Sequence, residues 1–166
     1  MRSARGWFLA GVALYALVWA WSWTRLPERV PVHFGAGGEP DEWSSRGAAL
    51  LTSGLLGLGI AVLFVGCVAL VRRTSGEFVN VPYARYWKRP ENLGRMRALM
   101  AGDLWLFGAW TMLLLTGVDW LIVRAATAAD PGLGWWPLVL VGVYLLGTAA
   151  RLAWMYRRRY VPPAGG

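Results

Sequence analysis

Long apolar segments alternate with short polar stretches along this chain of 166 residues. A bilayer core about 30 Å thick requires roughly 20 apolar residues in a helix. Four segments meet that requirement, at residues 7–23, 48–71, 98–123 and 133–155. The stretches at 24–47 and 72–97 are too short to form a soluble domain with its own core. The pattern predicts an all-α fold, a four-helix transmembrane bundle that is one integral membrane domain over residues 1–166, with a structured loop between its first two helices.

Composition agrees with this prediction. Hydrophobic residues make up 57% of the chain and charged residues only 16%, whereas about a quarter of a soluble chain is charged. The lipid bilayer is therefore a predicted partner. Arg2 and Arg5 precede the first apolar segment, as they would in a secretory signal, but this segment is rich in tryptophan and no small-residue cleavage site follows it. We predict an uncleaved anchor.

The basic residues are distributed unequally between the two sides of the predicted bundle. Lys and Arg in short loops are retained on the cytoplasmic side of a membrane. One side carries Arg2, Arg5, Arg72, Arg73, Arg85, Lys88, Arg89, Arg95, Arg97, Arg157, Arg158 and Arg159, and the other carries Arg25, Arg29, Arg46 and Arg124. We expect both termini and residues 72–97 to be cytoplasmic, and residues 24–47 to be extracytoplasmic, in a bacterial inner membrane. Anionic lipids then account for the net charge of +8, so no nucleic-acid partner is expected.

Two charged residues inside the predicted spans are matched in depth. Asp103 and Arg151 each lie about six residues, or roughly 9 Å, from the cytoplasmic ends of their helices. A charge in hydrocarbon costs a few kcal/mol and usually faces a partner or water. We predict an interhelical ion pair, with less than about 6 Å between the two charged groups. A transport pathway is the alternative role for both residues.

A third charge, Asp119, is predicted near the extracytoplasmic end of the third span. Its sequence neighbours are apolar or aromatic. If its carboxylate faces the bundle interior, it could accept a hydrogen bond from His33 or pair with Arg25, Arg29 or Arg124. The alternative is a partly hydrated carboxylate at the membrane interface.

The extracytoplasmic loop holds the only histidine of the chain, His33. Prolines and glycines make this loop a stiff turn scaffold. We expect His33 to be a structural fastener, with Asp41 capping the turn or the second span. Recognition of a ligand or partner is the second interpretation, through His33, Gly35, Gly38, Glu39, Asp41 and Trp43. A metal ion held by His33, Glu39 and Asp41 is the third.

The sequence gives little support for catalysis. It contains no H-E-x-x-H helix, no G-x-S-x-G turn and no glycine-rich loop followed by Lys and Ser or Thr. A single histidine also excludes haem ligation by two histidines of one chain. We expect neither an enzyme nor a cofactor.

Two segments carry a family resemblance. The pattern L-P-x-x-V-P-V-H-F-G-x-x-G-x-P-D-x-W at residues 26–43 resembles the bacterial membrane family with domain of unknown function 1648, whose relatives include Sdp-type immunity and signalling proteins. Residues 80–87, Asn-Val-Pro-Tyr-Ala-Arg-Tyr-Trp, resemble a second element of many members. We expect this basic aromatic stretch to lie along the inner headgroups. The resemblance implies instead that it recruits a cytoplasmic regulator.

Two functions remain open at this point. The first is a non-enzymatic sensor or immunity-like protein that recognises an extracytoplasmic peptide, toxin or envelope component through residues 26–43. The second is a transporter of small solutes or ions that uses Asp119, Asp103 and Arg151.

Overall fold

Four long helices dominate the computed structural model, which describes residues 2–77 and 79–163. They are α1 (Arg2–Arg25), α2 (Arg46–Arg73), α4 (Pro90–Thr127) and α5 (Trp136–Trp154). Each is long and apolar enough to cross a membrane. The four predicted spans are therefore confirmed. The third helix begins at Pro90, eight residues before the apolar segment, because proline is well suited to the first helical position.

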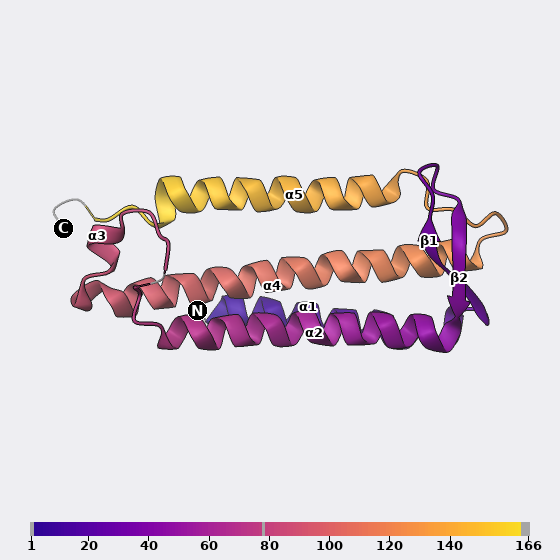
Figure 1. Ribbon diagram of the computed structural model, residues 1–166, viewed down its shortest axis with the longest axis horizontal. Coiled ribbons are helices and arrows are strands. Elements are labelled where there is room, and N and C mark those ends of the chain that lie inside the picture. The colour runs from indigo at the N-terminus through magenta and orange to yellow at the C-terminus, as the bar shows by residue number, and fades with distance from the viewer. Residues whose placement is uncertain (1, 78, 164–166) are drawn as a thin grey trace.

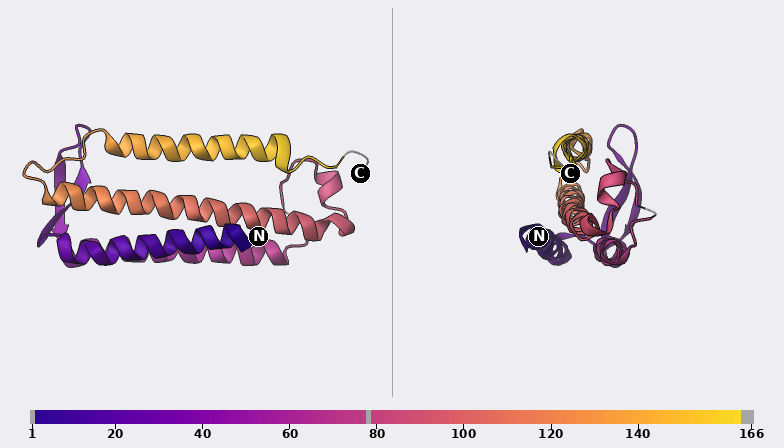
Figure 2. Two further views of the ribbon diagram at one scale, coloured as in Figure 1. Left: turned by 180° about the vertical axis from the view of Figure 1, so that it is seen from behind. Right: turned by 90° about the vertical axis from the view of Figure 1, so that its left-hand side faces the viewer.

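The helices do not form a closed bundle of four. Figures 1 and 2 show α4 between the other helices, with α1 and α2 on one side and α5 on the other. Among the described residues, α5 contacts α4 but neither α1 nor α2. No residue of α5 is buried. Most of the exposed surface of α5 is apolar, and lipid can cover a surface of this kind.

The main core lies between α1, α2 and α4. Phe8 and Tyr15 of α1 pack with Trp105 and Met112 of α4. The rings of Phe8 and Trp105 are 4.8 Å apart. Gly108 makes this approach possible, because a Cβ atom there would lie 2.8 Å from the ring of Phe8. Small residues at a helix contact allow such close packing within a membrane.

The connection between α1 and α2 contains a β-hairpin, which the all-α prediction did not include. Strand β1 (Arg29–Phe34) pairs antiparallel with β2 (Pro40–Ser45). Alternation of apolar and polar residues is typical of a short strand, but Pro31 and the glycines interrupt this pattern in the sequence. The ladder is irregular on both sides of His33. We call this end of the molecule the hairpin end.

Ser45, and not Asp41, caps α2. Its side chain accepts a hydrogen bond from the backbone N–H of Ala48 at 3.2 Å. The predicted capping role of Asp41 is therefore wrong for the helix. Asp41 lies in β2, four residues before the capping residue Ser45.

The opposite end, which we call the arginine end because it carries Arg157–Arg159, is closed by a folded cap. It includes helix α3 (Ala84–Trp87) and a π-helical turn, η1 (Met155–Arg159), that continues α5. Trp87 is 1% exposed and donates from Nε1 to the carbonyl of Tyr160 at 2.8 Å. The prediction that residues 80–87 lie along lipid headgroups is therefore wrong for Trp87, because the end of the chain returns to cover it.

Candidate functional site

The hairpin is fixed to the helices at both of its ends. Near the strand ends, Val30 is fully buried in a cluster with Leu26, Leu50 and Val123. At the tip, the carbonyl of Gly38 accepts a hydrogen bond from the N–H of Leu133, in the connection between α4 and α5, at 3.1 Å. The hairpin is thus attached to the rest of the protein at two separate places.

Gly38 makes the contact at the tip possible. Its φ of +88° is strained for any residue with a side chain. A Cβ atom at this position would also lie 3.1 Å from the backbone nitrogen of Gly134. Both the turn and its approach to the second loop therefore require glycine here.

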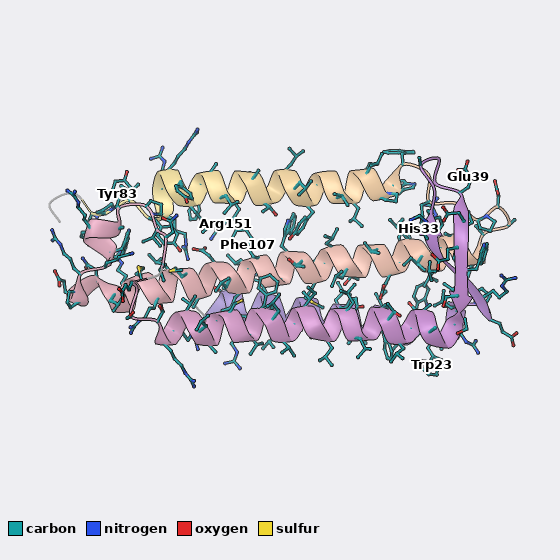
Figure 3. All side chains as sticks on the ribbon, in the orientation of Figure 1. Trp23, His33, Glu39, Tyr83, Phe107 and Arg151 are labelled. Carbon is teal, nitrogen blue, oxygen red and sulfur yellow. The ribbon has the colours of Figure 1, made fainter. Side chains whose placement is uncertain are left out.

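Several polar side chains of the hairpin are exposed. Nδ1 of His33 lies 2.6 Å from Oδ1 of Asp41, and the two side chains are 65% and 53% exposed. Trp43 is 39% exposed, with the guanidinium of Arg29 6.0 Å from its ring centre. Figure 3 shows His33 and Glu39 at the hairpin end of the molecule. We call His33, Asp41, Trp43 and Arg29 the hairpin face.

The carboxylate of Asp41 raises the pKa of His33 above its ordinary value of 6.5. A carboxylate that accepts a hydrogen bond from imidazolium favours the charged ring. The folded state therefore binds this proton more tightly than the unfolded chain. The pair stabilises the hairpin fully below pH 6.5, and that contribution is lost as the pH rises through the raised pKa.

We expect the Asp41→Asn variant to return the pKa of His33 close to 6.5. Histidine-selective labelling followed by NMR over a pH titration measures this directly, because the chain has one histidine and so gives one ring signal. Glu77→Gln, at an exposed position far along the chain, is the matched control and should leave the titration unchanged. Equal midpoints for wild type and Asp41→Asn would show that the pair does not form in solution.

The residues suggested for a metal ion do not converge. Asp41 lies beside His33, but the side chain of Glu39 folds back over Gly37, where its Oε2 would lie 2.3 Å from an added Cβ atom. Within the described part of the chain, no group of three or more His, Cys, Asp or Glu side chains could hold a metal. The hairpin face therefore offers two ligands, fewer than such a site requires.

Asp119 lies apart from the hairpin face. Its Oδ2 atom is buried without a hydrogen-bond partner among the described residues, and Tyr15 is a neighbour of its side chain. The arginines suggested as partners are placed over tryptophan rings. These pairs are Arg25 with Trp21, Arg29 with Trp43, and Arg124 with both Trp120 and Trp136. Asp119 is thus a carboxylate of α4 that lies beside the core of α1, α2 and α4.

Asp103 and Arg151 are in direct contact near the arginine end. Nη2 of Arg151 lies 2.5 Å from Oδ1 of Asp103, well inside the 6 Å expected for a pair. The other oxygen, Oδ2, accepts from Nε of Arg159 at 2.9 Å and from the hydroxyl of Tyr160 at 3.0 Å. Asp103 is 2% exposed, so its carboxylate is enclosed by these three donors.

Arg159 and Tyr160 were not predicted as partners of Asp103. In the sequence, Arg157–Arg159 indicate only the orientation of the chain in the membrane. In the structure, the wider π-helical turn from Met155 to Arg159 changes the direction in which Arg159 leaves the helix. No simple periodicity in the sequence predicts such a turn, although Trp154 and Tyr160 on either side indicate an interfacial helix end.

The comparisons support the family resemblance. Residues 10–57, which include most of α1, the hairpin and the first turns of α2, match the family described as Domain of unknown function (DUF1648). That part of the chain is similar to this class of domain. An uncharacterized protein of the archaeon Archaeoglobus fulgidus is 35% identical over 88 residues, which are 49% of this chain and 45% of that protein. No solved structure matches the chain.

Proposed function

We propose that this protein is a non-enzymatic sensor or immunity-like protein of the cytoplasmic membrane, and that its hairpin face recognises a peptide or another component of the cell envelope. The observation that carries the proposal is the exposed His33–Asp41 pair on a hairpin attached at both ends. A rigid frame lowers the entropy cost of binding, because the polar groups are already placed.

The chemistry of the hairpin face favours a polar ligand with an aromatic or apolar part. Trp43 offers a partly exposed ring of the kind that is enriched at interfaces. His33 and Asp41 offer a charged donor and acceptor side by side. Exposed charged groups of this type select a partner more than they add affinity.

The proposed orientation follows from the basic residues. Arg72, Arg73 and Arg157–Arg159 all lie at the arginine end, which supports a cytoplasmic location for that end. The hairpin face is then extracytoplasmic, and the cap that contains Trp87 is the surface available to a cytoplasmic regulator.

The transporter alternative has weaker support. Asp103 already has three hydrogen-bond donors. Asp103 and Asp119 are 16 positions apart, which corresponds to roughly 24 Å along α4, and the core beside them is apolar. A polar path that joins the two carboxylates would need a rearrangement of this core.

In-cell photocrosslinking tests the proposal. We expect a photoreactive amino acid in place of Trp43 to give a defined covalent adduct, and the additional change Asp41→Ala to remove it while abundance stays the same. The same probe in place of Trp120, which is exposed on α4, is the control for random contacts. Equal labelling from positions 43 and 120, or an adduct that persists with Asp41→Ala, would contradict recognition by the hairpin face.

A further inference from the structure

A cavity at the arginine end is lined by three guanidinium groups. It has a volume of about 440 Å³ and lies between the start of α1, at Ser3 and Ala4, and the neighbouring parts of α4 and α5. Arg95, Arg151 and Arg159 contribute the charges. We call this space the arginine cavity.

The charges around the arginine cavity do not balance. Asp103 is the carboxylate that binds Arg151 and Arg159, and the guanidinium of Arg95 lies instead over the ring of Trp87 at 5.9 Å. Three positive groups therefore face one negative group within the described residues, a surplus of two. An anion that accepts hydrogen bonds from two guanidinium groups at once, such as a phosphate, would offset part of this positive charge.

An apolar groove continues from the arginine cavity between α4 and α5. Its volume is about 280 Å³, and its lining includes Phe107, Trp110, Gly147 and Thr148. Arg151 and Leu106 line both spaces. Figure 3 shows the side chains of Arg151 and Phe107 between these two helices.

Two polar atoms at this groove have no partner in the described structure. They are Nε of Arg151 and Oγ1 of Thr148, both buried. Buried polar atoms are nearly always hydrogen-bonded in proteins. Two such atoms along one groove indicate that an acceptor belongs there, at the level where the arginine cavity meets the apolar part.

We propose that the arginine cavity and the groove together form a site for one anionic phospholipid, with the headgroup phosphate between Arg95, Arg151 and Arg159 and one acyl chain between α4 and α5. The phosphodiester carries one negative charge, which offsets half of the surplus, and its free oxygens can accept from two guanidinium groups. The ester oxygens are the proposed acceptors for Nε of Arg151 and Oγ1 of Thr148. The groove is open to the bilayer because α5 contacts no long helix other than α4. A free phosphate would satisfy the charges but leave the groove empty.

Titration of the detergent-purified full chain tests this site by native mass spectrometry. Dioleoyl phosphatidylglycerol should give a saturable one-to-one adduct, whereas dioleoyl phosphatidylcholine and inorganic phosphate should not. Arg95→Gln leaves the contacts of Asp103 intact and should weaken the phosphatidylglycerol adduct about tenfold, the ratio expected for one charge-assisted hydrogen bond. Arg85→Gln removes an exposed arginine outside the cavity and is the matched control.

The groove is tested separately by Thr148→Val, which keeps the shape of the side chain and removes its hydroxyl. This variant should also bind phosphatidylglycerol more weakly than wild type. Equal binding of the two lipids, equal effects of Arg95→Gln and Arg85→Gln, or competition by inorganic phosphate at the same concentration as the lipid would each overturn the proposal.

Discussion

The Asp103→Asn variant should be the least stable of the single substitutions considered for this protein. Asp103 is 2% exposed and accepts from Arg151, Arg159 and Tyr160. Asparagine keeps the size of the side chain but removes its charge and one acceptor oxygen. Two guanidinium groups then remain close together without a counter-ion. Breaking a buried pair in this way costs about 3 kcal/mol.

Equilibrium unfolding in mixed micelles, followed by tryptophan fluorescence, measures this loss. Asp130→Asn is the control, since Asp130 is exposed in the connection after α4 and should change the free energy of unfolding by less than about 0.5 kcal/mol. Adding Arg159→Gln to Asp103→Asn should restore part of the stability, because it relieves the repulsion between the two arginines. Equal stability of Asp103→Asn and Asp130→Asn would mean that the cluster does not hold α5 against α4.

The second large effect is expected at Gly57, where α2 meets α1. A Cβ atom at this position would lie 2.0 Å from Cε1 of Tyr15, so the Tyr15 ring must move. Its hydroxyl now donates to the carbonyl of Ser53 at 2.6 Å, and the movement breaks that bond. Gly57→Ala should therefore lower the free energy of unfolding by about 1–3 kcal/mol, the usual cost of overpacking.

Gly59 provides a matched control on the same helix. No atom lies within 4 Å of a Cβ atom added there. Alanine is favoured over glycine in a helix by about 0.8–1 kcal/mol, so Gly59→Ala should be neutral or stabilising in the same unfolding experiment. The combination of Gly57→Ala with Tyr15→Ala removes the clash and should cost less than the sum of the two changes. If Gly57→Ala behaved like Gly59→Ala, α1 and α2 would not be in close contact in the membrane.

The strand pairing of the hairpin and the burial of Trp87 at the arginine end both depend on contacts between segments that are far apart in the sequence. The sequence showed Pro31, Gly35 and Gly38 in one polar loop, but strand pairing and its register depend on the docking of Val30 against Leu50 and Val123. Trp87 carried the sequence pattern of an interfacial residue. It is buried because Tyr160, 73 residues away, covers it.

The sequence by itself determined the number of spans, their approximate bounds, the position of His33 between the first two, and the matched depth of Asp103 and Arg151. These features follow from hydropathy and helix length, which are local properties of the chain. The tertiary structure alone decided that α4 is the only long helix on which α5 packs, that Asp103 also binds Arg159 and Tyr160, that Glu39 folds back over Gly37, and that Gly38 contacts Gly134. Such contacts depend on packing between segments far apart in the sequence, and no local pattern specifies which segments meet.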